Sequence, residues 1–244
     1  SAGQTYYLGK VRATSPKQIK LLEQANGDER KAIGAGLFVL GGKGQGAYAQ
    51  INTINNGVVE LIEPLKVMPD QSSAVSIVPL QKNYLFISNR ITDAGVAIQF
   101  YGSSIDFVAA DNVTTRSGGF MASGRWYKGG YQPSWYCQFL GNQIIDGNVY
   151  RGGSNNATLV GEAIIGIAGL PRPPNTTPLV FAEVVRGNRL DANAHIDING
   201  GSNSAQPGVQ DIIVQGNVIR NSVKGIDVSK GAAGMLSLEN ELPQ

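Results

Sequence analysis

The 244-residue chain contains 42% hydrophobic and 16% charged residues, 32 glycines and a formal net charge of +2. Low charge with abundant glycine is typical of a β-rich chain with many tight turns. The near-neutral balance excludes the basic surface by which proteins bind nucleic acid. No stretch approaches the roughly 20 apolar residues of a membrane span. The single Cys137 excludes an internal disulfide, and we expect it to be a buried core thiol.

Residues 1–32 differ in pattern from the rest of the chain. The run from Ser15 to Gln24 predicts a short helix, with Ser15 as its cap and Pro16 at the first helical position. Such a helix would cover the open strand edges of a first coil. We therefore expect an N-terminal cap segment at 1–32 and one repeat domain at 33–244.

Strand-like runs punctuated by proline occupy residues 33–80, and we expect them to form the entry coils of that domain. The glycine cluster at 41–46 lies among them. It lacks the spacing of a nucleotide-binding loop and does not open a helix, so it predicts turns.

An asparagine recurs at a nearly fixed period from residue 84 onward, each time between short apolar stretches. The intervals between successive members are 23, 30, 46, 29 and 23 residues. A period in the low twenties with occasional insertions is typical of a solenoid. The six positions are Asn89, Asn112, Asn142, Asn188, Asn217 and Asn240.

Two properties of asparagine favour a β-solenoid. Asparagine tolerates the left-handed backbone region and so fits a sharp corner between strands. Stacked corners also allow the side-chain amides to hydrogen-bond into a ladder along the stack. Leucine-rich repeats have a similar period but require Leu at fixed offsets, where this chain has Ala, Gly, Thr and Gln. With leucine-rich repeats excluded, the sequence predicts a parallel β-helix with three short strands per coil.

On these residues the chain resembles, over roughly 33–244, the right-handed parallel β-helix proteins of the pectate-lyase-like group. That group includes secreted carbohydrate-active enzymes and phage tailspikes. The resemblance implies an all-β, single-stranded right-handed parallel β-helix with a secreted or extracellular location. It also implies a polysaccharide partner and leaves a monomer and a homotrimer open. The group contains lyases, hydrolases, epimerases and non-catalytic binders, so the activity must be argued from a site.

An aromatic insertion between Asn112 and Asn142 is the first candidate site. Sugar rings stack on exposed Trp and Tyr, while flanking Arg or Lys can hold the carboxylates of uronates. The alternative is that the later aromatic residues of the insertion, Trp135 among them, only pack. The predicted glycan-binding residues are Arg125, Trp126, Tyr127, Lys128 and Tyr131.

Alignment of the coils gives a second candidate site. Three segments superpose with Ile98, Ile196 and Ile226 facing inward. Strand alternation then turns the residues between them outward in columns. Two carboxylates on adjacent coils would suit acid–base chemistry, and the column resembles the carboxylate-lined groove of β-helix hydrolases. The alternative is a solvated polar face. The prediction assigns catalysis to Asp197, Asp227 and His195, and glycan binding to Gln99, Tyr101 and Asn199.

A lyase would need Arg or Lys as the base and would take Ca²⁺ on acidic ligands. Arg116, Arg125 and Lys128 could serve as the base, but no acidic cluster with metal-ligand spacing stands near them. We therefore assign no metal ligand and no cofactor, with Ca²⁺ reserved for the lyase alternative. Asp93, Arg116 and Asp146 share one offset after a ladder Asn, which predicts turn chemistry.

The sequence thus predicts an extracellular β-helix protein that binds and cleaves a polysaccharide, as a lyase or a glycoside hydrolase. The alternative is a non-catalytic structural or adhesive β-helix, such as a tailspike-like fibre or a glycan-binding module.

Overall fold

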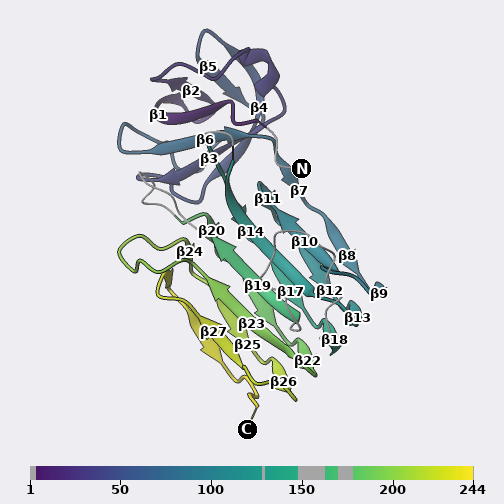
Figure 1. The fold of residues 1–244 in the computed structure, drawn as a ribbon. Coiled ribbons are helices and arrows are strands. Elements are labelled where there is room, and N and C mark those ends of the chain that lie inside the picture. Colours follow the sequence, from purple (N-terminus) through teal and green to yellow (C-terminus); the bar gives the residue numbers. More distant parts are fainter. Residues whose placement is uncertain (1–3, 128–129, 148–162, 170–177, 244) are drawn as a thin grey trace.

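The computed structural model describes residues 4–127, 130–147, 163–169 and 178–243. These residues form twenty-nine strands and one short 3-10 helix, η1 (Glu29–Ala32). The strands divide into an N-terminal β-barrel, at the top of Figure 1, and a stack of parallel strands below it. No helix in the described part of the chain is long and apolar enough to cross a membrane.

The barrel is closed by six antiparallel strands in the order β1-β2-β5-β4-β3-β6. Apolar side chains such as Val11, Ile51 and Val59 alternate inward and fill it. The six strands are β1 (Tyr7–Ser15), β2 (Gln18–Leu21), β3 (Gly36–Gly41), β4 (Tyr48–Asn55), β5 (Val58–Leu61) and β6 (Ala74–Val78).

The barrel corrects the prediction of an N-terminal capping helix. Ser15 ends β1 and residues 18–21 form β2, which pairs antiparallel with β1 and β5. Ile19 and Leu21 are both buried at a spacing of two. That spacing fits a strand, and so short a segment cannot form a stable isolated helix. The fold changes between Val78 and β7 and not at residue 32.

The entry coils predicted for residues 33–80 are also absent, because these runs pair antiparallel within the barrel. One local signal accounts for part of the difference. Asn56 and Gly57 join β4 to β5 with φ of 49° and 67°. A two-residue Asn-Gly connection with positive φ at both positions is the commonest tight β-hairpin turn, and it forces antiparallel neighbours.

The stack begins at Gln81, and successive coils pair in parallel in four sheets, one strand more per coil than predicted. Sheet 1 consists of β10 (Ile98–Tyr101), β14 (Gly119–Tyr127), β19 (Ala163–Gly169), β23 (Ala194–Asn199) and β27 (Ile226–Val228). The strand β15 (Gly130–Gln132) pairs antiparallel with β14.

The other three sheets contain short strands. Sheet 2 consists of β7 (Gln81–Lys82), β11 (Ser104–Ile105), β16 (Ser134–Trp135), β20 (Val180–Phe181), β24 (Val209–Gln210) and β28 (Ala232–Ala233). Sheet 3 consists of β8 (Leu85–Ile87), β12 (Val108–Ala110), β17 (Gln138–Leu140), β21 (Val184–Arg186), β25 (Ile213–Gln215) and β29 (Leu236–Leu238). Sheet 4 consists of β9 (Arg90–Thr92), β13 (Val113–Thr115), β18 (Gln143–Asp146), β22 (Arg189–Asp191) and β26 (Val218–Arg220).

The predicted asparagine ladder is confirmed between sheets 3 and 4. The side-chain oxygen of Asn142 accepts hydrogen bonds from the backbone and side-chain amides of Asn112, at 3.1 and 2.9 Å. The Asn142 side-chain amide donates in turn to Asn188 and to the carbonyl of Ala109. The same pattern links Asn89 to Asn112 at one end and Asn217 to Asn240 at the other.

The left-handed corner, however, does not fall on the asparagine. It falls on the preceding residue, whose φ lies between 54° and 65° in every coil. Asparagine is therefore required for its buried side-chain hydrogen bonds and not for its backbone tolerance. The six left-handed residues are Ser88, Asp111, Gly141, Gly187, Gly216 and Glu239.

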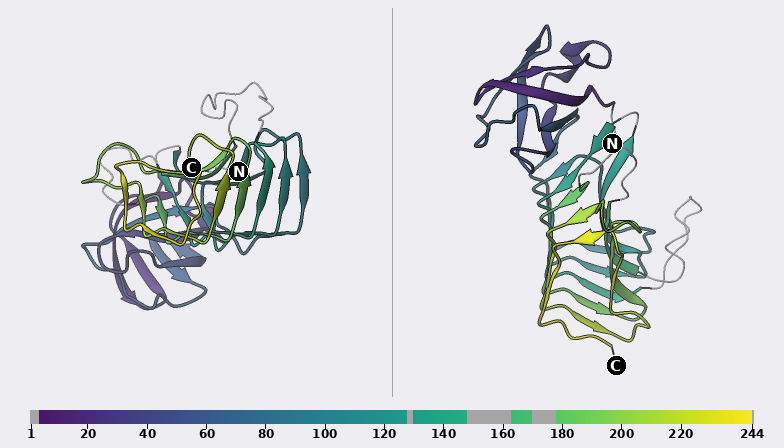
Figure 2. Two further views of the ribbon diagram at one scale, coloured as in Figure 1. Left: turned by 90° about the horizontal axis from the view of Figure 1, so that it is seen from below. Right: turned by 90° about the vertical axis from the view of Figure 1, so that its left-hand side faces the viewer.

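The barrel packs against the side of the stack next to sheet 2 (Figure 2). Phe38 and Leu40 of the barrel share an apolar cluster with Trp135 and Tyr131 of the stack. Hydrogen bonds join the same surfaces, from the hydroxyl of Tyr48 to Asp106 at 2.5 Å and from that of Tyr136 to the carbonyl of Gly46 at 2.7 Å. The two parts therefore form a tightly packed junction, and the outer face of sheet 1 lies on another side of the stack.

Candidate functional site

The outer face of sheet 1 carries the predicted column of polar residues. Asp197 pairs in register with Asp227 on the next strand, and the buried Ile196 pairs with Ile226. The coil alignment predicted from sequence is therefore confirmed for these residues. Toward the first coil the column continues through Gly166 and Met121 to Gln99.

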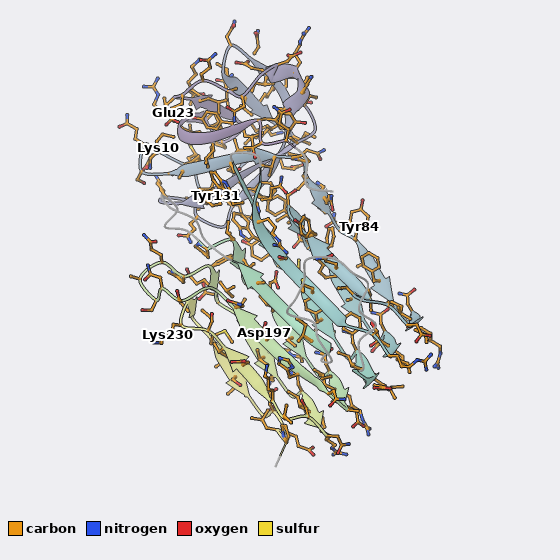
Figure 3. The ribbon with its side chains drawn as sticks, viewed as in Figure 1. Lys10, Glu23, Tyr84, Tyr131, Asp197 and Lys230 are labelled. Carbon is orange, nitrogen blue, oxygen red and sulfur yellow. The ribbon has the colours of Figure 1, made fainter. Side chains whose placement is uncertain are left out.

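Asp197 and Asp227 are the only adjacent pair of carboxylates in this column among the described residues. Neighbouring strands lie about 4.8 Å apart, so residues paired in register on one face hold their side chains at close to that separation. Asp197 is half-buried and Asp227 is exposed. Figure 3 shows Asp197 on the broad face of sheet 1. The two carboxyl groups are therefore neighbours on a face that is open to solvent at this end.

The ends of these two strands are held by side chains beside the pair. The Ser229 hydroxyl accepts a hydrogen bond from the backbone amide of Gly200 at 2.8 Å. The side-chain oxygen of Asn199 accepts from the amide of Gly201 at 3.1 Å. Asn199 and Ser229 thus fix the strand ends. The Asn199 side-chain amide nitrogen can also donate to a sugar hydroxyl.

His195 lies on the same face as Asp197, two residues before it on β23, but it is only 4% exposed. It pairs in register with Ile164, and the outward-facing Ile164 and Met121 are almost as enclosed, at 7% and 9%. Sheet 1 therefore has an enclosed part and an accessible part. His195 belongs to the enclosed part, where it can position its neighbours and cannot reach a glycan.

The aromatic insertion forms a hairpin between β14 and β15, in which Trp126 pairs with Tyr131 and the two rings meet edge to face at 4.5 Å. Tyr131 is 3% exposed and belongs to the cluster between stack and barrel, and Trp126 packs against that cluster. Figure 3 shows Tyr131 at this junction. The geometry favours packing over sugar stacking for Tyr131. The Tyr127 backbone lies in β14, and Lys128 lies outside the described residues.

We expect Tyr131→Ala to lower the free energy of unfolding by about 3 kcal/mol, because it removes a large buried aromatic ring. The measurement is urea denaturation of the full chain. The Tyr84 ring is 51% exposed, so Tyr84→Ala is the matched control, with an expected loss below about 1 kcal/mol. Equal losses for the two variants would show that the junction adds little stability.

Arg125 is held beside the column and not within the aromatic cluster. Its guanidinium lies 4.8 Å from the centre of the Tyr101 ring. A cation over an aromatic face is attracted by the ring quadrupole. This contact brings one residue of each candidate site together at the ends of β10 and β14, the two strands of sheet 1 that are farthest from Asp227.

Arg116, a candidate lyase base, is already paired. Its guanidinium donates two hydrogen bonds of 2.6 Å to Asp93 on the neighbouring coil. The pair raises the pKa of Arg116 and lowers the pKa of Asp93. A base must first lose its proton, so this pairing opposes catalysis by Arg116. Within the described ranges, no group of three or more His, Cys, Asp or Glu residues could hold a metal ion.

One titratable residue was not identified from the sequence. Glu183 is completely buried in the stack beside Cys137, whose predicted core location is confirmed. The alignment of the coils could have identified Glu183. The equivalent position in other coils is occupied by Phe107, Ile212 and Met235. A glutamate among such residues is out of pattern.

No family model matches the chain, and no curated protein matches it. Among solved structures, the chain is similar to the tailspike protein gp49 from Pseudomonas phage LKA1, with 12% sequence identity and a TM-score of 0.34. The match covers 91% of this chain and 43% of the tailspike chain. This chain therefore spans less than half of the length of the tailspike protein. A likeness at this level assigns no function. The fold defines the class of the protein, a parallel β-solenoid with an attached β-barrel.

Proposed function

We propose that the protein binds a polysaccharide along the outer face of sheet 1 and hydrolyses it, with Asp197 and Asp227 as the reacting carboxyl groups. The observation that carries this proposal is the in-register pairing of the two residues on adjacent parallel strands. Most glycoside hydrolases use two carboxyl groups that flank the bond to be broken. The short separation expected here suits a nucleophile and an acid–base partner.

The column supplies binding groups as well as reacting ones. Gln99 is exposed and Tyr101 is half-buried on β10, at the end opposite Asp227. Four strand spacings separate Gln99 from Asp227, which is about 19 Å along the stack. The buried Met121 and Gly166 divide this column into two accessible ends. Gln99 and Tyr101 would hydrogen-bond sugars at one end, and Asn199 would do so at the other.

The charges favour hydrolysis over elimination. A lyase must neutralise the uronate carboxylate with a cation and then remove a proton. Of the candidate bases, Arg116 is paired with Asp93 and Arg125 lies over Tyr101. The lyase alternative would therefore depend on Arg125 and Lys128, with Ca²⁺ as its cofactor.

We place the chain with the right-handed, single-stranded β-helix proteins of the pectate-lyase-like group, acting outside the cell. The support is the confirmed asparagine ladder together with the parallel four-sheet stack.

The alternative is a non-catalytic adhesive or structural β-helix, and one surface favours it. Aliphatic side chains point outward from both ends of sheet 3, with Leu85 65%, Ile87 51%, Leu236 47% and Leu238 43% exposed. The outward positions between them include Val108, Val184 and Ile213. An apolar strip along a solenoid can pack against other copies, as a homotrimeric fibre would require.

Affinity electrophoresis through gels containing neutral or uronate polysaccharides tests the binding proposal. The wild-type protein should be retarded by at least one polysaccharide, and Gln99→Ala should weaken that retardation. Glu60→Gln, on the barrel strand β5, is the control and should change nothing. Retardation that Gln99→Ala leaves intact and that Trp126→Ala removes would move the site to the aromatic hairpin.

A further inference from the structure

Glu183 lies in the core of the stack at the corner between sheets 2 and 3. It directly precedes β21, and its column holds Phe107 and Cys137 on one side and Ile212 on the other. Successive members are joined by backbone hydrogen bonds, from Val184 to Cys137 and from Ile213 to Glu183. The carboxyl group therefore occupies a place that an apolar side chain fills in the neighbouring coils.

The surroundings of the carboxyl contain few polar groups. One carboxyl oxygen of Glu183 accepts a hydrogen bond from the Ser134 hydroxyl at 3.0 Å. The other is buried without a hydrogen-bond partner. The Cys137 sulfur lies 3.5 Å from the same hydroxyl. An ionised carboxylate needs several donors to offset its lost hydration, so this site can accommodate only the neutral acid.

Among the described residues, no charged group of the neighbouring elements compensates Glu183. Cys137, on the preceding coil, is the ionisable group beside it. On the flanking corners, Asp106 bonds to the hydroxyl of Tyr48, and the exposed Asp211 accepts from Gln210. Arg186 is exposed on the outer side of β21. Burial therefore dominates and raises the pKa of the Glu183 carboxyl, more than the hydrogen bond from Ser134 lowers it.

We propose that Glu183 is a proton-dependent latch, which keeps its coil closed while it is protonated and opens that coil when it ionises. The coil that opens includes Phe181, two residues before Glu183, whose ring packs at the junction with the barrel. Between them, Ala182 holds a left-handed φ of 53°. Opening would therefore loosen the contact between stack and barrel as well as the stack itself.

The direction of the pH effect follows from proton linkage. In the unfolded chain a glutamate has a pKa of about 4.3, whereas the buried carboxyl stays neutral to higher pH. The stability that Glu183 contributes is complete below the unfolded pKa and is lost as pH rises toward the folded pKa. Between these two pKa values, the equilibrium constant for opening of the coil increases about tenfold for each pH unit.

The single cysteine reports this opening, because Cys137 is buried beside Glu183 and reacts only when the coil opens. Alkylation of Cys137 by iodoacetamide is measured at several pH values on the full chain, in wild type and in Glu183→Gln. The intrinsic reactivity of the thiol cancels in the ratio of the two rates. We expect this ratio to rise about tenfold per pH unit above pH 5 until the folded pKa is reached.

Two further variants keep the test decisive. Glu183→Met places the residue of a neighbouring coil, Met235, in the column, and the wild-type rate relative to this variant should show the same rise. Asp211→Asn removes an exposed carboxylate from the next coil and should keep the pH dependence of the wild type. The proposal would be overturned if the Cys137 alkylation rate of the wild type, divided by that of Glu183→Gln and by that of Glu183→Met, stays constant from pH 5 to about pH 9.

Discussion

Asn142→Leu is expected to lower the free energy of unfolding by about 4 kcal/mol, because each buried polar group left without a partner costs about 1–3 kcal/mol. Leucine has nearly the same volume but neither donates nor accepts. The substitution leaves the backbone amide of Asn112 without its acceptor and the carbonyl of Ala109 without its donor. Both residues are fully buried, so water cannot replace the lost hydrogen bonds.

Urea denaturation followed by circular dichroism measures this loss. Asn89→Leu is the matched control, because Asn89 ends the ladder, is exposed and only donates to Asn112. Its expected loss is about 1 kcal/mol. An Asn142→Leu variant as stable as the wild type would show that the ladder is incidental to the stack.

Asp197→Asn and Asp227→Asn are each expected to reduce turnover of the bound polysaccharide by about 10²–10⁴-fold, the usual contribution of a group that transfers a proton. The amide keeps the size of the side chain and loses its ability to act as an acid, base or nucleophile. Asp191→Asn, on β22 of sheet 4, is the control and should keep full activity. Near-full activity of both test variants, in folded protein, would reduce the pair to a solvated face.

The stereochemistry of the reaction follows from the same geometry. A separation of about 5 Å between two carboxyl groups matches a retaining mechanism, whereas about 6.5–9.5 Å would leave room for water and imply inversion. If the pair is catalytic as proposed, the in-register pairing of Asp197 and Asp227 on neighbouring strands predicts the retaining mechanism. Proton NMR of the first product should therefore show the anomeric configuration of the substrate.

The stack was predictable because its signal repeats along the chain. In each coil, the side-chain amide of one asparagine donates a hydrogen bond to the asparagine of the next coil. The interval between successive asparagines therefore equals the length of one coil. The alternation around Ile196 and Ile226 then fixed the register, and with it the pairing of the two aspartates. Neither inference needed a contact between distant, unrelated segments.

The barrel was missed because its strands show the same alternation but carry no repeat. The sequence of a short apolar run does not indicate whether the run pairs parallel or antiparallel with its neighbour. In the barrel, the Asn56-Gly57 turn was the feature that indicated antiparallel pairing. The place of Tyr131 was missed for a related reason. Its burial depends on Phe38 and Leu40 of the barrel, so the hairpin appeared as an exposed insertion when the barrel was unknown.

Hydrolysis by Asp197 and Asp227 is decided by product analysis on the polysaccharides that retard the protein. Wild type and the double variant Asp197→Asn/Asp227→Asn are incubated with each polysaccharide, and new reducing ends are measured alongside the ultraviolet absorbance of unsaturated sugars. We expect reducing ends without that absorbance in wild type, and neither product in the double variant. Unsaturated products, or reducing ends that persist in the double variant, would contradict hydrolysis by this pair.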